Sequence, residues 1–316
     1  MRARLIAQYG VVAALAVLIG FGALRYPRFL SEYNLLTFLR YNSMFALVSL
    51  GMAFVIMSGG IDLSVGAVAA LGSVVSALCS GEGWALGLAA GAGAGLAIGL
   101  LNGLVIVRLG IAPFIATLAT MLAARGAALL LAGNQSVPVS YETLFTNLGQ
   151  DNWLGFPIPA WIAALAYGFG LLLLNLTASG RTVLAIGDNE DAARLMGLPV
   201  DRVKLLTYAG SGLLAGVAGV ILAAQFGAGQ PIEGAGWELF AISAVVVGGT
   251  LLTGGRGSLT TTFAGVLLLG LIFNLLNFEN GLGHISLSAY WQSVIRGAFL
   301  LLVVLLQTGL GRLRAG

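Results

Sequence analysis

The chain has 316 residues, of which 59% are apolar and only 9% are charged, and its mean hydropathy is +0.98. A soluble domain carries about 25% charged residues, so this composition excludes a surface that is mostly exposed to water. The net charge of +3 is small and requires no nucleic-acid partner. Runs of roughly 18 or more apolar residues recur, each long enough to cross about 30 Å of hydrocarbon. We expect one all-α, polytopic membrane domain over residues 1–316.

Ten membrane spans are expected in chain order. They are residues 5–24, 35–57, 63–80, 84–107, 112–132, 159–177, 204–226, 238–252, 258–276 and 290–308. The first run follows the basic stretch MRAR, as in a signal peptide. It holds about 20 apolar residues and no A-x-A cleavage site follows it, so we expect a retained anchor.

The distribution of Lys and Arg predicts the orientation, because cytoplasmic loops are rich in these residues. With the N-terminus inside, the inside segments hold Arg2, Arg4, Arg108, Arg181, Arg194, Arg202, Lys204, Arg256, Arg312 and Arg314, and the outside segments hold only Arg25 and Arg28. Both termini are therefore expected in the cytoplasm. The loop at 133–158 then lies outside, and the charged loop at 178–203 lies inside.

The remaining arginines, Arg40, Arg125 and Arg296, fall in the outer halves of their expected spans. Each can extend its charged end to the outer interface. Alternatively, the three line an outer vestibule, where Glu238 and Gln225 are similarly placed.

Glycines at strict four-residue spacing mark the fourth span, at Gly87, Gly91, Gly95, Gly99 and Gly103. Such spacing places them on one stripe of a helix, where a neighbouring backbone can approach closely. The seventh span has a shorter version in Gly212 and Gly216. The stripe predicts tight helix packing rather than a direct role in a pathway.

Two glycine-rich junctions resemble each other. MSGGIDLSVG at 57–66 and LTGGRGSLTT at 252–261 each carry a Gly-Gly pair after an apolar span. The pattern predicts two weakly repeated, parallel halves, and interrupted helices at matching positions indicate a transport site. The junction residues are Gly59, Gly60, Asp62, Gly66, Gly254 and Gly255.

Asp62 lies between apolar runs, where a charge is costly unless it is hydrogen-bonded or faces water. We expect it to cap the start of the third span by accepting the N–H of Ser64 or Val65. The same residue can also line a polar cavity. The candidates for a translocation pathway are Asp62, Ser64, Asn102, Gln225 and Asn274.

The inside loop contains DNEDAARLMGL at 188–198, which predicts a short amphipathic helix with an acidic N-terminus. Taken alone, the pattern also fits a solvated connector.

Residue types that occur only once in the sequence exclude several kinds of site. Cys79 and His284 are the only cysteine and histidine, so there is no internal disulfide and no His-rich metal site. Lys204 is the only lysine, and no GxxxxGK[ST] phosphate-binding loop is present.

DAARLMG resembles the E-A-A-x-x-x-G loop of ATP-binding-cassette importer permeases, with Asp191 in place of the usual Glu. GGIDLSVG and AIGDNEDAARLMGL are similar to recurrent signatures of the ribose-type sugar permease family, and AISAVVVGGTLLTGGRGS at 241–258 resembles a later element. The resemblance runs from about Tyr26 to Leu305. Within the family, YPRF, MSGGIDLSVG and VVVGGTLLTGG are most similar to galactofuranose permease subunits.

This resemblance implies a permease subunit of a sugar importer in the bacterial inner membrane, with no enzymatic activity of its own. ATP and Mg would be bound by separate cytoplasmic ATPase subunits, so no cofactor is expected in this chain. A second permease, identical or not, and a periplasmic sugar-binding protein are the other implied partners. The coupling residues would be Asp188, Asn189, Glu190, Asp191, Ala192, Ala193, Arg194 and Gly197.

Three alternatives remain from the residues themselves. An ion-coupled secondary transporter of a small polar solute would need no ATPase. An intramembrane serine protease would use Gly210-Ser211-Gly212, but the expected topology places His284 in an outer loop. A passive channel would show a selectivity filter, and no stretch resembles one.

Overall fold

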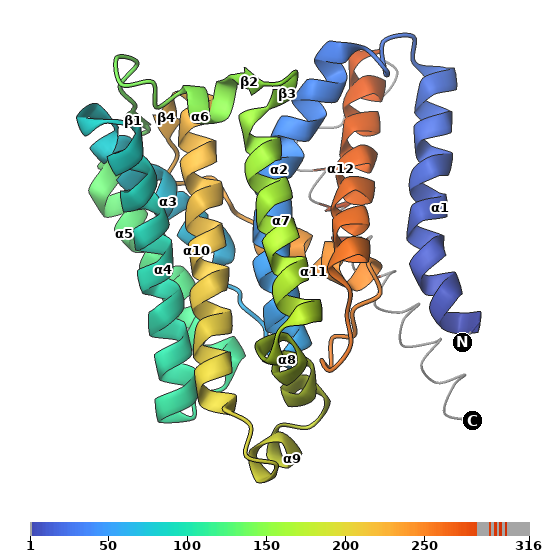
Figure 1. The fold of residues 1–316 in the computed structure, drawn as a ribbon. Coiled ribbons are helices and arrows are strands. Elements are labelled where there is room, and N and C mark those ends of the chain that lie inside the picture. The colour runs from blue at the N-terminus through green and yellow to red at the C-terminus, as the bar shows by residue number, and fades with distance from the viewer. Residues whose placement is uncertain (1, 283–290, 292–293, 296, 299–300, 302–316) are drawn as a thin grey trace.

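The computed structural model describes residues 2–282, 291, 294–295, 297–298 and 301, and these residues are mostly helical (Figure 1). The helices are α1 (Arg2–Arg25), α2 (Glu32–Met57), α3 (Val65–Cys79), α4 (Trp84–Leu109), α5 (Pro113–Ala132), α6 (Asn147–Gln150), α7 (Ile158–Leu176), α8 (Ala178–Asp188), α9 (Glu190–Leu195), α10 (Val200–Phe226), α11 (Trp237–Val247) and α12 (Leu259–Gly281). Four two-residue strands are β1 (Val137–Pro138), β2 (Asn152–Trp153), β3 (Phe156–Pro157) and β4 (Ala228–Gly229), in antiparallel pairs β1–β4 and β2–β3.

The long helices form a bundle with two distinct ends (Figure 1). The strands and α6 lie at one end, here called the strand end, and α8 and α9 project from the other, the α9 end. Within the described residues, seven helices are long and apolar enough to cross a membrane: α2, α3 with its following turn, α4, α5, α7, α10 and α12. The prediction of an all-α polytopic membrane protein is confirmed.

The eighth expected span, 238–252, is wrong in length. Helix α11 ends at Val247 after 11 residues, which at 1.5 Å per residue is roughly 16 Å, about half of the hydrocarbon thickness. The helix ends because Gly248 lies against the backbone of Thr261 and Gly249 adopts a φ of 86°. The tenth expected span, 290–308, lies largely outside the described residues.

The helix pairs are also related in a second way, which the sequence does not predict. Helix α2 runs toward the α9 end, and the extended link 58–64 returns into the bundle to begin α3 (Figure 1). Helix α10 runs toward the strand end, and the link 227–236 returns to begin α11. The pairs α2–α3 and α10–α11 therefore correspond with opposite directions, as in inverted repeats. Both Gly-Gly stretches lie toward the α9 end, 57–66 between α2 and α3 and 252–261 between α11 and α12.

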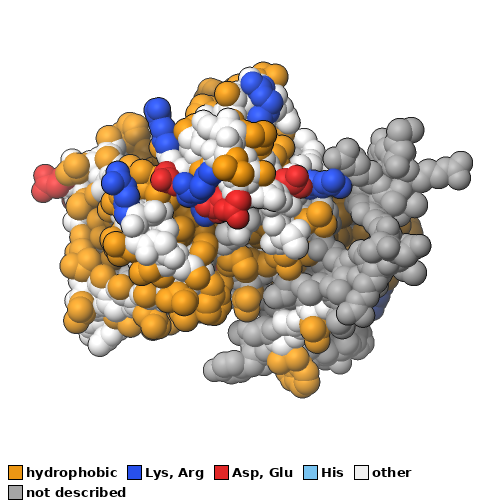
Figure 2. Space-filling model, turned by 90° about the horizontal axis from the view of Figure 1, so that it is seen from below, with side chains coloured by type: hydrophobic (Ala, Val, Ile, Leu, Met, Phe, Trp, Pro, Cys, Tyr) orange, Lys and Arg blue, Asp and Glu red, His pale blue; other side chains and the backbone are white. Residues whose placement is uncertain are grey.

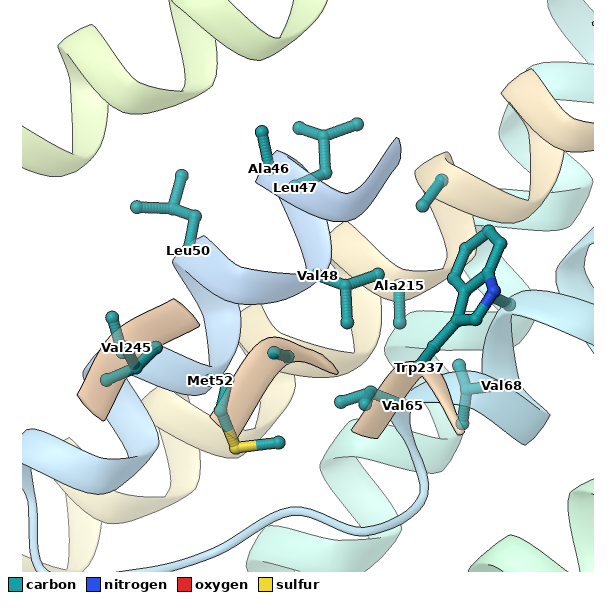
Figure 3. Packing of buried hydrophobic residues seen from close by; sticks show 14 of the residues in the cluster. Ala46, Leu47, Val48, Leu50, Met52, Val65, Val68, Ala215, Trp237 and Val245 are labelled. Atoms are coloured by element: carbon teal, nitrogen blue, oxygen red, sulfur yellow. The ribbon is translucent and has the colours of Figure 1, made fainter. Parts of the chain in front are cut away.

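The two short helices begin next to each other inside the bundle. A side chain at Gly66 would clash with the carbonyl of Gly234, and one at Gly234 with that of Gly66. Figure 3 shows the indole of Trp237 beside Val65 and Val68, and all three side chains are buried. The core thus fixes where both helices begin.

The glycine stripe packs as expected. All five stripe glycines of α4 are buried, and a Cβ at Gly95 would lie 2.7 Å from Cα of Gly216. Gly212 on α10 faces Gly99 in the same way, with 2.7 Å to its Cα. The prediction of close backbone packing is confirmed, and the partner helix is α10.

Candidate functional site

Asp62 is the centre of a buried polar network. Its Oδ1 accepts hydrogen bonds from the backbone N–H of Ser64 at 3.0 Å and from the Ser64 hydroxyl at 2.6 Å. Its Oδ2 accepts from the hydroxyl of Ser211 on α10 at 2.8 Å. The carboxylate has no accessible surface, so these three donors replace water around it.

The network continues across two more helices. The side-chain amide of Asn102 on α4 donates to the Ser64 hydroxyl at 3.0 Å. The hydroxyl of Thr120 on α5 donates to the side-chain oxygen Oδ1 of Asn102 at 2.6 Å. Asn102 and Ser64 are at most 1% exposed. The chain of bonds therefore connects α10, the start of α3, α4 and α5 through the interior of the bundle.

The expected hydrogen bond from the Ser64 N–H to Asp62 is confirmed, just before the first residue of α3. Ser64 itself occupies the N-cap position and makes no side-chain capping bond. Because Asp62 is fully buried within the chain, the structure places it in an internal connection rather than on a cavity wall.

The other pathway candidates lie elsewhere. Asn274 on α12 forms a reciprocal amide pair with Asn34 on α2, at 2.9 and 3.3 Å. Gln225 lies near the strand end of α10, where its backbone carbonyl accepts from Gln150 at 3.2 Å. The structure therefore joins only three of the five candidates, Asp62, Ser64 and Asn102.

The arginines at the strand end have specific partners. Arg125 on α5 donates to the carbonyls of Pro231 and Glu233, both at 2.6 Å, and so holds the link that precedes α11. Arg40 donates to Asn152 at 3.0 Å. Arg296 and His284 lie outside the described residues. Among the described residues, no group of three His, Cys, Asp or Glu is placed to hold a metal ion.

The Gly-Gly pairs meet at the α9 end. The N–H of Gly255 donates to the Met57 carbonyl at 3.0 Å. A Cβ at Gly254 would lie 2.8 Å from the nitrogen of Gly59 and 3.0 Å from Cα of Gly187. Gly187 directly precedes the expected coupling residues, so three separate backbones converge where the α8–α9 segment joins the bundle.

Helix α9 is a well-formed but short helix of six residues, Glu190–Leu195. Asn189 caps it by accepting the N–H of Ala192 at 2.9 Å, and Gly197 ends the turn with a φ of 75°. The predicted helix is confirmed within narrower limits than 188–198. Ala193 is fully buried, whereas Leu195 and Met196 are 89% and 68% exposed at the tip.

Ion pairs attach α9 to the start of α10. Glu190 binds Lys204 at 2.7 Å and Arg194 at 3.1 Å, and Arg194 binds Asp201 at 2.6 Å. Figure 2, viewed from this end, shows charged side chains of both signs gathered among apolar ones. Two of the expected coupling residues, Glu190 and Arg194, thus use their charges within the chain.

The pKa values of these two groups follow from the pairing. Partial burial raises the pKa of Glu190, but the hydrogen bonds and charges of Lys204 and Arg194 outweigh it, so the pKa lies below its usual value. The hydrogen bond to Asp201, followed by that to Glu190, raises the pKa of Arg194. Both groups are therefore charged at neutral pH.

Some functional candidates were missed from the sequence. Ser211 was considered only as a protease nucleophile, but its hydroxyl is bonded to Asp62, 149 residues away. The exposed pair Leu195 and Met196 is recognisable in sequence as two apolar residues at the end of a charged helix. No sequence signal identified Gly187 as the third member of the glycine junction.

Comparison with known proteins gives a consistent assignment. Residues 34–304 match a family model described as "Branched-chain amino acid transport system / permease component". The chain is 42% identical to the L-arabinose transport system permease protein AraH of Escherichia coli K12, over 94% of this chain and 89% of that protein. It is also 42% identical to the ribose import permease protein RbsC of Bacillus subtilis 168, over 95% and 92% of the two chains. An L-arabinose ABC transporter permease protein AraH of Azospirillum brasilense is 36% identical over 96% of this chain and 88% of that protein. No solved structure matches significantly.

Proposed function

The chain belongs to this family of transport-system permease components, and we infer from that membership that it is the membrane-spanning permease subunit of an ATP-binding-cassette sugar importer. The observation that carries the sugar assignment is the near full-length similarity to proteins named for L-arabinose and ribose. The family description names amino acids, but the relatives at 42% identity are sugar permeases. We propose that the solute is a neutral monosaccharide, and galactofuranose stays a prediction beside arabinose and ribose.

We propose that α9 is the coupling helix and seats in a groove of a cytoplasmic ATPase. This proposal is supported by the geometry of the α9 tip, where Leu195 and Met196 are exposed on a segment held by ion pairs. Neighbouring exposed apolar side chains on a projecting tip provide apolar surface for contact with a partner protein. The ATPase would bind ATP and Mg, and this chain would carry no catalytic activity.

The α9 end would then face the cytoplasm of a bacterium, in agreement with the positive charge predicted for the inside loops. The strand end would face the periplasm and receive the sugar from a binding protein. A second permease, identical or not, would complete the pathway, as in importers of this kind.

We propose that α10 transmits movement from the ATPase to the interior. Its first turns hold α9 through Asp201 and Lys204, and its middle holds the start of α3 through Ser211. A displacement of α9 therefore moves a helix that is bonded to Asp62. Such a connection is what alternating access requires, since ATP binding must change which side of the membrane the pathway faces.

The test is co-purification of the tagged permease with its partners, with and without Leu195→Asp. Leu109→Asp is the matched control, because Leu109 is 68% exposed and ends α4 at the same end of the bundle. We expect an ATPase to co-purify with the wild type and the control, and to be lost from Leu195→Asp. Retention by both variants would refute the coupling role of α9.

Uptake of labelled arabinose, ribose and galactofuranose into proteoliposomes containing the purified complex identifies the sugar. Uptake that needs no ATPase and collapses with an ionophore would instead support the ion-coupled transporter.

A further inference from the structure

A groove of about 300 Å³ opens between α7 and α10 in the half of the bundle toward the α9 end. Leu50, Gly51 and Phe54 of α2 form its floor, and Ser179, Gly180 and Val183 of α8 close its lower end. Helix α7 packs mainly on α2 and α8, while α10 packs on α4, α3 and α2. The two helices run side by side in Figure 1, and the groove is the space that their side chains leave unfilled.

The lining of the groove is unsuited to a sugar. Of its three hydroxyl groups, that of Ser211 is bonded to Asp62 and that of Thr207 to the Val203 carbonyl in its own helix, which leaves Ser179 at the α8 end. The remaining walls are largely Leu, Phe, Val, Ala and Gly. Because a sugar must replace its bonds to water with bonds to protein, these walls favour an apolar occupant.

The dimensions of the groove match one leaflet of a bilayer. On α10 the lining runs from Val203 to Leu214, which spans roughly 16 Å at 1.5 Å per residue. Half of a hydrocarbon core of about 30 Å is nearly the same length. An acyl chain that enters from the leaflet at the α9 end would therefore fit the length of the groove.

One arginine lies beside the groove at its α9 end. Arg202 directly precedes the lining residue Val203 and is one turn before Leu206 on the same side of α10. Its side chain is exposed and forms no salt bridge within the described part of the chain. Guanidinium groups bind phosphate with paired hydrogen bonds. We propose that the groove between α7 and α10 binds an anionic phospholipid, with the acyl chain in the groove and the phosphate on Arg202.

A lipid in this groove would affect how α8 is held against α10. The floor of the groove includes Gly51, and a Cβ there would lie 2.8 Å from Cα of Ser211. An acyl chain in the groove fills the space beside Ser211 and holds α7 and α8 against α10. The lipid therefore supports the same helix that carries α9 and Asp62.

The experiment measures the lipid retained by the full-length permease after reconstitution with equal parts of phosphatidylglycerol and phosphatidylethanolamine, using native mass spectrometry. Gly210→Leu fills the groove, since a Cβ there has no atom within 4 Å. Gly168→Leu on α7 is the control, because that glycine is equally unobstructed and lies outside the groove lining. We expect retained phosphatidylglycerol in the wild type and in Gly168→Leu, and its loss in Gly210→Leu.

A second pair of variants tests the headgroup contact without changing the groove. We expect Arg202→Gln to lower the ratio of phosphatidylglycerol to phosphatidylethanolamine about fivefold, the factor expected for one basic side chain at an anionic surface. Arg108→Gln, at the same end on α4, should leave the ratio unchanged. Equal retention by both leucine variants, or a ratio that Arg202→Gln does not alter, would overturn the proposal.

Discussion

The hydrogen bond from Ser211 to Asp62 allows a quantitative test of the buried network. Ser211→Ala removes one of three donors to a carboxylate that water does not reach. A hydrogen bond to a charged group contributes about 1.5–3 kcal/mol. Alanine occupies nearly the same space, and Ser211 is only 1% exposed, so packing changes little. We expect a loss of about 2 kcal/mol in the free energy of unfolding.

The assay is thermal unfolding of the purified protein in detergent, together with sugar uptake by the reconstituted importer. Ser243→Ala is the matched control, because Ser243 is also buried but its hydroxyl donates only to the Leu239 carbonyl of its own helix, at 2.6 Å. The control should lose less than about 1 kcal/mol and keep its uptake. Equal losses in the two variants would refute the view that the bond between α10 and Asp62 matters.

Substitution of Asp62 separates its charge from its geometry. Asp62→Asn keeps one acceptor for the two Ser64 donors, and the Ser211 hydroxyl can rotate to accept from the new amide. Asp62→Ala leaves all three donors unpaired in a buried site, which costs about 1–3 kcal/mol for each. We expect the alanine variant to be much less stable than the asparagine variant. If Asp62→Asn retains full stability and transport, the charge itself has no role.

Three further predictions concern packing and the α9 attachment. Gly99→Ala should prevent folding, because the new Cβ would clash with the Tyr208 carbonyl. The control is Gly93→Ala on the same helix, whose Cβ would meet no atom within 4 Å, and it should yield normal amounts of folded protein on size exclusion. Gly187→Ala should reduce uptake by displacing the α8–α9 segment from the Met57 carbonyl, and unchanged uptake would argue against the glycine junction. Because the pKa of Glu190 is lowered in the folded protein, its contribution is complete above about pH 4.3, the unfolded value, and is lost as the pH falls through the folded pKa. After correction for the intrinsic pH dependence of exchange, the α9 amides should therefore exchange equally slowly at pH 7 and pH 5 and faster below about pH 4. Glu190→Gln should abolish this acceleration at low pH.

Much of the fold could be predicted from the sequence because its signals are local. The length of each apolar run predicts a membrane helix from the thickness of the bilayer alone. The spacing of Gly91, Gly95 and Gly99 places them on one face whatever the partner helix is. Asn189 and Gly197 mark the two ends of α9, and each forms hydrogen bonds with residues at most four positions away.

What the sequence failed to predict concerns contacts between distant residues. The hydropathy of 238–252 continues past Val247, but α11 ends there because Gly248 packs against the backbone of α12. The sequence indicated only that the two Gly-Gly pairs match, whereas the structure shows that Gly59 and Gly254 approach each other and Gly187.

The residue pattern alone predicts that this protein spans a membrane with helices, which helices pack through glycine, and where α9 forms. Each of these properties depends on burial or hydrogen bonding within one or two helical turns. The three-dimensional contacts were needed to show that Asp62 is bonded to Ser211, that α3 and α11 begin side by side, and that α9 is attached to α10. Those contacts join residues far apart in the chain, and one sequence contains no local pattern that specifies which distant polar group satisfies a buried carboxylate.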